Sequence, residues 1–295
     1  MPIDLPRAVS FMAGHARTLD RRRLEHLLGG GDPAAVLAAL DGYRNSDGGY
    51  GWGLEPDLRA AESQPAGALH AFEALGDVAP ATSPRAVELC DWLASVALPD
   101  GGLAFALPVA DDAATAPFWA DADPAVSSLQ ITAYVAAAAQ RVAAFDPAVA
   151  GHQWLARATR YCLDAIAALG AAPHAIALNA ALGLLDALHD TQPEAPALLR
   201  RLGEFIPADG RLPVAGGAEG ESLGALDLAP FPDRPVRALF GADVVERELE
   251  HLVAAQQDDG GWRTDFASYS PAATQEWRGY MTVRAVLVLR RNAVI

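Results

Sequence analysis

A turn signature recurs along this chain at a nearly constant spacing, and it restricts the fold to a repeat architecture. The four copies are Ser46-Asp47-Gly48-Gly49-Tyr50, Pro99-Asp100-Gly101-Gly102-Leu103, Ala208-Asp209-Gly210-Arg211-Leu212 and Asp258-Asp259-Gly260-Gly261-Trp262. Gly101 follows Gly48 by 53 residues, Gly210 follows Gly101 by 109, and Gly260 follows Gly210 by 50, so the middle interval holds two periods. In such a protein no unit buries its apolar face without its neighbours. The 295 residues therefore predict five to six units.

The segments between the turns show no strand-like alternation, so each unit is predicted to be a pair of helices. Helices that precede a turn carry their apolar residues on one face, which is typical of an outer surface. Their apolar faces are Ala86, Leu89, Cys90, Leu93 and Ala97; Leu155, Ala158, Cys162, Ala165, Ile166 and Leu169; and Val245, Leu249, Leu252 and Val253. Helices that follow a turn, such as 131–137, 176–188 and 283–289, are apolar all round and so indicate cover on every side. The alternation predicts an all-α fold, an α/α toroid with the apolar helices in its inner ring.

Charge and hydropathy limit the partners. No apolar run reaches the roughly 18 residues of a membrane span, so integral membrane association is not expected. The net charge of -15 disfavours nucleic acid and anionic membrane surfaces. Residues 1–23 are interrupted by charges and lack the apolar core of a signal peptide. Together with Cys90 and Cys162, which lie on apolar helix faces and are expected to stay reduced, this predicts a cytoplasmic protein.

A linker between separate domains is not evident. The segment 214–235 is rich in Gly, Ala, Pro and Asp, but the repeat resumes in phase at Gly260, so we interpret it as a long loop. A second long connection runs from 106 to 123. We therefore predict a single domain over residues 1–295, with both long loops at the same end of the toroid, where function concentrates.

The run from Gln256 to Trp262 resembles the Gln-x3-Gly-x-Trp motif of squalene and oxidosqualene cyclases, and Asn45 to Trp52 is a looser copy. The resemblance implies the toroid that this family shares with class II diterpene cyclases and the β-subunits of protein prenyltransferases. In that family the motif is structural, which implies that Gln256 and Trp262 tie an outer helix to the turn. It also implies a hydrophobic small-molecule substrate of isoprenoid type.

The segment Phe118-Trp119-Ala120-Asp121-Ala122-Asp123-Pro124 stands at the predicted start of an inner helix. It resembles the Asp-x-Asp-Asp motif of class II terpene cyclases, which implies Asp123 as the proton donor and Asp121 as its polar neighbour, although Pro124 replaces the last Asp. Protonation of carbon needs a carboxylic acid held protonated in an apolar pocket, and nearby rings such as Trp119 and Phe118 stabilise carbocations. Asp123 before Pro124 is equally typical of a helix cap without chemistry.

Two further groups are candidates for substrate binding. Tyr50 and Trp52 are followed directly by Glu55, Asp57 and Arg59, which lie either at the mouth of the predicted cavity or in a solvated, self-paired charge cluster. The second group, Glu276, Trp277 and Tyr280, opens the last inner helix.

No metal site is predicted. Neither cysteine forms the Asp-x-Cys pair of the zinc prenyltransferases, and His70, His174, His189 and His251 are scattered singly. No protein-bound cofactor is expected, apart from Mg²⁺ if the substrate is a diphosphate.

Three functions stay open, in this order. The first is an isoprenoid cyclase of class II type, initiated by protonation at Asp123. The second is a carbohydrate-active α/α barrel, in which Glu55 or Asp57 would face Asp123 or Glu276 across about 5 to 9 Å of an open groove. The third is a noncatalytic binder of a hydrophobic ligand.

Overall fold

A computed structural model describes residues 3–295, and the chain is all-α as predicted. The strands of this described part are two short ones, β1 (Leu212–Pro213) and β2 (Ser222–Leu223), which pair antiparallel with Leu212 opposite Leu223. Two compact units divide the chain: Leu40–Leu202 forms one, and Met1–Ala39 with Gly203–Ile295 forms the other. The single domain predicted for residues 1–295 stays a prediction.

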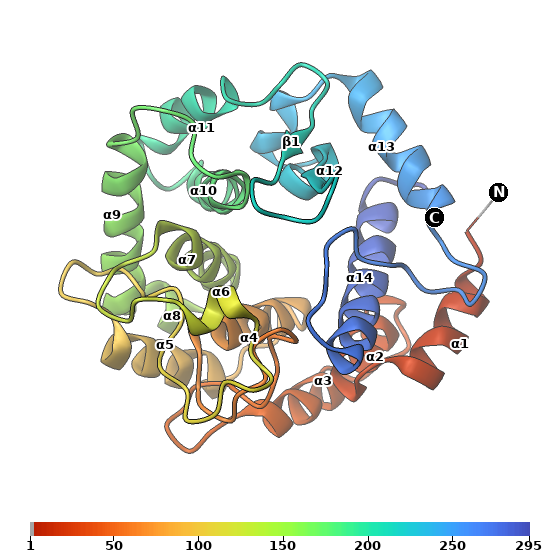
Figure 1. The fold of residues 1–295 in the computed structure, drawn as a ribbon, viewed down its shortest axis with the longest axis horizontal. Coiled ribbons are helices and arrows are strands. Elements are labelled where there is room, and N and C mark those ends of the chain that lie inside the picture. The colour runs from red at the N-terminus through yellow and green to blue at the C-terminus, as the bar shows by residue number, and fades with distance from the viewer. Residues whose placement is uncertain (1–2) are drawn as a thin grey trace. The chain divides into compact units, whose positions relative to one another are not determined.

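The unit Leu40–Leu202 is built from two rows of helices. Its elements are η1 (Asp41–Tyr43), α4 (Pro65–Asp77), α5 (Pro84–Val96), α6 (Pro117–Ala120), α7 (Leu129–Ala143), α8 (Pro147–Ala150), α9 (Gln153–Ala167), α10 (Ala175–Leu188) and α11 (Ala195–Gly203). Helices α4, α7 and α10 lie side by side, while α5 and α9 contact each other and cover α4 and α7 (Figure 1). The apolar character of 131–137 and 176–188 agrees with this placement, since α7 and α10 bury residues around most of their circumference.

The other unit is organised around its longest helix, α14 (Pro271–Arg291), which contacts α1 (Leu5–His15), α2 (Thr18–Leu27) and α13 (Ala242–Ala254). Its remaining elements are α3 (Pro33–Leu40), β1, β2, α12 (Ala225–Leu228) and η2 (Pro235–Leu239). Phe11, Met12, Leu24, Trp262, Val286 and Leu289 belong to its apolar core.

Three of the recurring turns dock on a helix in the same way. The first glycine of each has a positive φ, 90° at Gly48, 93° at Gly101 and 96° at Gly260. A Cβ added to these glycines would lie 3.1, 3.0 and 2.3 Å from a helix carbonyl oxygen, that of Glu88 in α5, Arg157 in α9 and Arg7 in α1 respectively. The glycine is therefore required twice, by its backbone conformation and by the close approach of the helix.

The second glycine of each turn makes room for an aromatic ring four residues further along the same helix. A Cβ at Gly49 would lie 2.6 Å from the Trp92 ring, one at Gly102 2.8 Å from Tyr161, and one at Gly261 2.7 Å from Phe11. Residues four apart share one face of a helix, so carbonyl and ring approach the turn together. The fourth turn is degenerate, since Gly210 meets the Val244 side chain of α13 and Arg211 pairs with Glu248, again four residues on, at 3.5 Å.

The turns also hold the start of the next apolar helix. The Ser128 N–H at the N-cap of α7 donates to the Leu103 carbonyl at 2.8 Å, and Gln64 N–H before α4 donates to Tyr50 at 2.9 Å. The aspartate of these turns accepts a hydrogen bond from the second glycine of the same turn. In the second turn, for example, Gly102 N–H donates to Asp100 Oδ1 at 3.0 Å. Each turn therefore positions two helices at once.

The predicted roles of Gln256 and Trp262 as structural ties are confirmed. Gln256 Oε1 accepts from Asp4 N–H at 2.9 Å, and Gln256 Nε2 donates to the carbonyls of Asp4 and Gly260, both at 3.0 Å. Asp4 is the N-cap of α1, so one amide joins this helix to the turn. Trp262 is 2% exposed and donates its indole N–H to Leu252 in α13 at 2.9 Å.

The expectation for residues 214–235 needs correction, whereas the burial of the two cysteines is confirmed. The segment 214–235 is not one irregular loop, because it contains β2 and α12. Cys90 and Cys162 are buried and free, and burial raises the pKa of both thiols, that of Cys90 to about 12. Within residues 3–295 no helix has both the length and the apolar character that crossing a membrane requires.

A matched pair of substitutions tests the docking of the turns. Gly260→Ala adds a Cβ that would lie 2.3 Å from the Arg7 carbonyl, whereas Gly216, at a φ of 76°, has nothing within 4 Å of an added Cβ. Both alanines are strained at positive φ, by about 1 to 3 kcal/mol, so the difference between the variants reports the close contact. In urea unfolding we expect Gly260→Ala to lose about 2 kcal/mol more stability than Gly216→Ala. Equal losses would contradict the docking.

Candidate functional site

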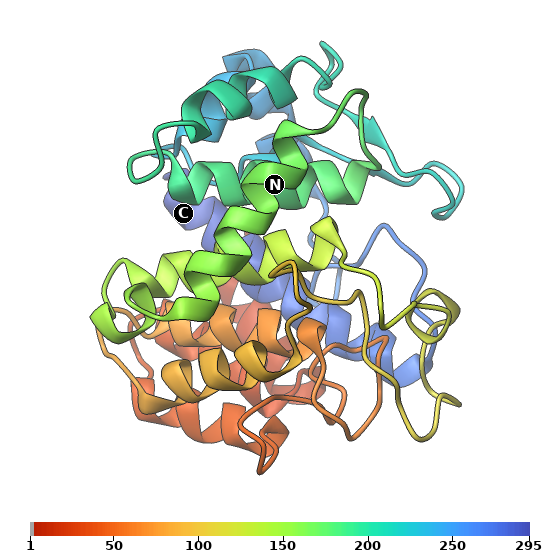
Figure 2. The same cartoon turned by 90° about the vertical axis from the view of Figure 1, so that its left-hand side faces the viewer.

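Two loops of the unit Leu40–Leu202 pair with each other where the sequence predicted substrate-binding residues. Residues 51–64 follow the first turn and 103–128 follow the second, and both extend beyond the helices of this unit (Figure 2). Leu58 and Thr115 form an antiparallel bridge, and Ala116 N–H donates to the Asp57 carbonyl at 2.8 Å. Gln64, 1% exposed, bonds Leu107 through both ends of its amide, at 2.8 and 3.0 Å.

A cavity of about 230 Å³ lies between these loops. It is lined by Leu58, Ala106, Leu107, Pro108, Val109, Asp112, Thr115, Trp119, Ala120 and Ala122. Most of the lining residues have apolar side chains, although polar atoms contribute almost as much of the lining surface as apolar atoms do. Leu58 and Ala106 belong to a small buried cluster against which Val109, Trp119 and Ala122 pack. The cavity is therefore suited to a molecule that has both an apolar part and a polar group.

Trp119 is the largest side chain in the cavity wall, and its ring is held firmly. It stacks on Phe105 with ring centroids 4.3 Å apart and ring planes 17° apart. The Phe118 ring is tilted relative to it, with the two centroids 5.4 Å apart. The Trp119 indole N–H and the Thr115 hydroxyl are both buried and have no hydrogen-bond partner within residues 3–295. Buried polar groups are nearly always paired, so these two groups of one cavity wall are available to hydrogen-bond a bound molecule or water.

The acidic residues of the same loop do not lie in an apolar environment. Asp121 and Asp123 are both exposed. Asp123 Oδ1 accepts from Ala125 N–H at 2.9 Å, and neither carboxylate lines the cavity. The expectation that Asp123 begins the inner helix is wrong, because α7 begins at Leu129 and Ser128 caps it by accepting from Ile131 N–H. Asp123 instead closes a local turn, through the side-chain-to-backbone bond typical of aspartate.

Glu55 and Asp57 are buried, at 7% and 5% exposed, and do not form a solvated cluster. Glu55 Oε1 accepts from Asp57 N–H at 3.1 Å, and Glu55 Oε2 lies 3.0 Å from His70 Nε2. The other ring nitrogen of His70 lies 2.9 Å from Glu73 Oε2. The imidazole of His70 therefore lies between the buried carboxylate of Glu55 and the partly exposed carboxylate of Glu73. Arg59 is half-buried, and its N–H donates to the Ala114 carbonyl at 3.4 Å.

The role of His70 was not predicted from the sequence, in which it stands as an isolated histidine. The available signal was its spacing from Glu73, since residues three apart on a helix are neighbours. Burial alone would lower the pKa of His70, but the charge of Glu73 and hydrogen bonds to Glu55 and Glu73 outweigh it and raise the pKa to about 9. His70 is therefore an imidazolium at neutral pH, and it neutralises part of the acidic charge buried behind the loops.

The two remaining aromatic candidates of this unit have different surroundings. Tyr50 is fully buried under the first turn, and burial raises its pKa to about 12, which fits a core position. Trp52 is 58% exposed with a φ of 56°, a conformation that bulky residues rarely adopt. Its indole N–H donates to Asn45 Oδ1 at 2.8 Å, which holds the ring in place at the surface.

Glu276, Trp277 and Tyr280 lie on α14 in the other unit. There Trp277 packs edge to face against Phe266 and Tyr280, with centroid distances of 5.2 and 5.5 Å. The Arg23 guanidinium lies 5.7 Å from the Tyr280 ring centroid. Phe266, Trp277 and Tyr280 therefore form an aromatic cluster in this unit.

No group of three or more His, Cys, Asp and Glu side chains among residues 3–295 is arranged to hold a metal ion. No protein-family model matches the sequence, and a search among curated proteins finds no match.

The buried imidazolium generates a pH-dependent contribution to stability. Because the pKa of His70 is about 9 in the folded protein and 6.5 ordinarily, its contribution is complete below pH 6.5 and is lost as the pH rises to 9. Across this window we expect the unfolding free energy of the wild type to fall by on the order of 3 kcal/mol relative to His70→Gln. Urea unfolding at a series of pH values measures it. His189→Gln, at a partly exposed histidine, serves as control and should keep the wild-type slope. A wild-type slope in His70→Gln would contradict the assignment.

Proposed function

We propose that the chain binds a small, mainly apolar molecule that carries one hydrogen-bond acceptor, in the cavity between residues 51–64 and 103–128. The observation that carries this proposal is the buried indole N–H of Trp119, a residue of the cavity wall, which has no hydrogen-bond partner within residues 3–295. A bound carbonyl, ether or hydroxyl oxygen would accept this hydrogen bond. The stacked Phe105 ring would keep the donor in place. This proposal corresponds to the third of the functions left open by the sequence, the noncatalytic binding of a hydrophobic ligand.

The size of the cavity sets the size of the ligand. Its volume of about 230 Å³ is below the roughly 300 to 1,000 Å³ of ordinary ligand sites. One ring or one branched five-carbon unit fits this space, whereas a whole squalene-like polyene does not. If the natural ligand is an isoprenoid, we propose that only a terminal unit of it enters here.

The other two functions have less support. The isoprenoid cyclase stays a prediction from resemblance, and the exposed Asp121 and Asp123 lack the apolar surroundings that a carbon-protonating acid needs. The carbohydrate-active reading required a carboxylate pair across an open groove, but Glu55 and Asp57 are buried beside His70.

We also propose that the helices form an α/α toroid. Each of the turns at Gly48 and Gly101 docks on the following amphipathic helix, α5 or α9. The turn at Gly260 docks in the same way on α1, the first helix of the chain. A repeat that closes on itself requires this relation between its last turn and its first helix.

Ligand binding is tested with a carbonyl probe and a substitution that removes the donor alone. Cyclohexanone, one ring with one acceptor, is titrated into protein labelled with ¹⁵N, and the indole N–H signals of the six tryptophans are followed. We expect the Trp119 signal to shift, and Trp119→Phe, which keeps a ring but no N–H, to bind about three- to tenfold more weakly. Trp52→Phe removes an exposed indole outside the cavity and should bind as the wild type does. Binding that is unchanged in Trp119→Phe would contradict the proposal.

A further inference from the structure

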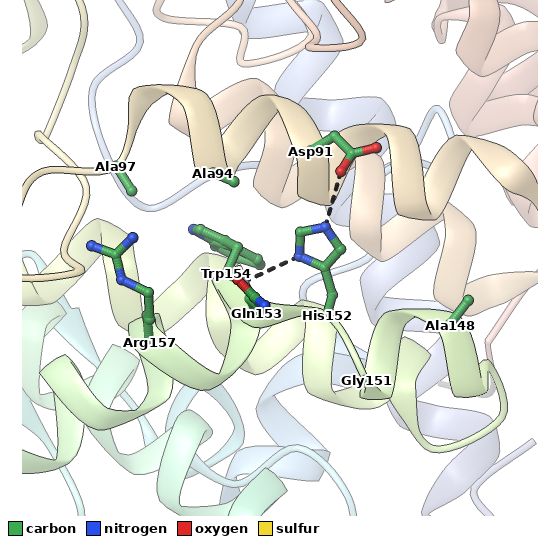
Figure 3. Close-up of a pocket in the computed structure, with 9 residues that line it drawn as sticks. All are labelled: Asp91, Ala94, Ala97, Ala148, Gly151, His152, Gln153, Trp154 and Arg157. Carbon is green, nitrogen blue, oxygen red and sulfur yellow. Dashed lines mark hydrogen bonds and ion pairs between the residues drawn. The ribbon is translucent and has the colours of Figure 1, made fainter.

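A second cavity, of about 400 Å³, lies between α5 and α9 and shares no lining residue with the first (Figure 3). One wall is formed by Asp91, Ala94 and Ala97 from α5 and its end, and the other by residues 151–154 and Arg157 around the start of α9. The lining combines small apolar side chains with one acid, one histidine and one arginine.

Trp154 lines this cavity and carries a buried donor without an acceptor. The residue is 2% exposed, and its ring stacks on Phe72 with the planes 6° apart and the centroids 6.4 Å apart. Its indole N–H has no hydrogen-bond partner within residues 3–295. A buried, unpaired donor is costly to keep, so its position in a cavity wall indicates an acceptor group supplied by a ligand.

The charged side chains stand at the two ends of the cavity. Figure 3 shows Asp91 at one end and Arg157 at the other, with Ala94 and Trp154 between them and the indole nitrogen toward the Arg157 end. Arg157 donates to the Pro99 carbonyl at 3.3 Å and pairs with no carboxylate in the described part of the chain. Its guanidinium is therefore available to an anion.

Asp91 is oriented by His152. The Nδ1 of His152 accepts from the backbone N–H of Trp154 at 3.2 Å, which places the ring proton on Nε2. His152 Nε2–H donates to Asp91 Oδ1 at 3.1 Å. The second oxygen, Asp91 Oδ2, has no partner among residues 3–295, and the side chain is 71% exposed. It is available to a cation.

We propose that this cavity binds a free α-amino acid with an apolar side chain. The carboxylate of the ligand would accept from Arg157 and from the indole N–H of Trp154, and its ammonium would donate to Asp91. The carboxylate that His152 orients and the Arg157 guanidinium lie at opposite ends of the same cavity, so one molecule that carries both a cationic and an anionic group can contact both (Figure 3). The side chain of the ligand would lie over Ala94 and Ala97.

Isothermal titration of the full chain with L-valine, L-leucine, L-methionine and L-phenylalanine tests the proposal. We expect at least one of them to bind. For L-leucine, leucinamide lacks the carboxylate, 4-methylpentanoate lacks the ammonium, and 6-aminohexanoate separates the two charges too widely. For the amino acid that binds best, the corresponding amide and deaminated acid should bind at least about tenfold more weakly, as should 6-aminohexanoate.

Substitutions assign the binding to this cavity. Trp154→Phe removes the N–H from the buried ring, while Arg157→Gln and Asp91→Asn remove the charges from exposed positions where folding is not at risk. Each should weaken binding by about tenfold. The exposed Arg200 on α11, changed in Arg200→Gln, controls for loss of one positive charge elsewhere and should leave affinity unchanged. No binding of any of the four amino acids, or equal affinity in Arg157→Gln and Arg200→Gln, would overturn the proposal.

Discussion

The close contact between a glycine at positive φ and a helix carbonyl is the interaction on which the rest of this structure depends. At Gly101 an added Cβ would lie 3.0 Å from the Arg157 carbonyl, so a side chain there would force the turn or α9 to shift. The following glycine admits the ring of Tyr161 from the same helix face. A turn that meets both conditions fixes where the chain leaves one helix and enters the next, and this determines where the loops begin.

The candidate ligand cavity follows from that placement. The first turn holds residues before α4 through Gln64 N–H, and the second holds the N-cap of α7 through Ser128 N–H. The loops 51–64 and 103–128 therefore start from fixed points, and the amide of Gln64 joins them at Leu107. Behind them His70 neutralises part of the charge that Glu55 and Glu73 bring into the core. Trp119 lies on α6, which has only four residues, so its position depends on the contacts between these two loops.

Much of the fold was predictable because it depends on local patterns. The turn spacing and the two kinds of helix predicted an all-α chain and the apolar helices α7 and α10, and the motif from Gln256 to Trp262 predicted the tie to a neighbouring helix. The site was less predictable, since it depends on contacts between loops. Trp119 was a candidate from the sequence, but the exposure of Asp123 and the burial of Glu55 beside His70 depend on how residues 51–64 meet 103–128. The periodic pattern of the sequence carries no information about this contact between the loops.

Amide hydrogen exchange of the turn glycines tests most directly whether the turns are docked. The amides of Gly49, Gly102 and Gly261 donate to the aspartate two residues earlier at 2.9, 3.0 and 3.1 Å, and all three glycines are buried. Arg211 makes the same local bond to Asp209 at 3.1 Å but is exposed. If helix docking protects the turns, the three glycine amides will exchange as slowly as the core of α7, and the Arg211 amide will exchange much faster. Equal protection factors at all four positions would contradict the account.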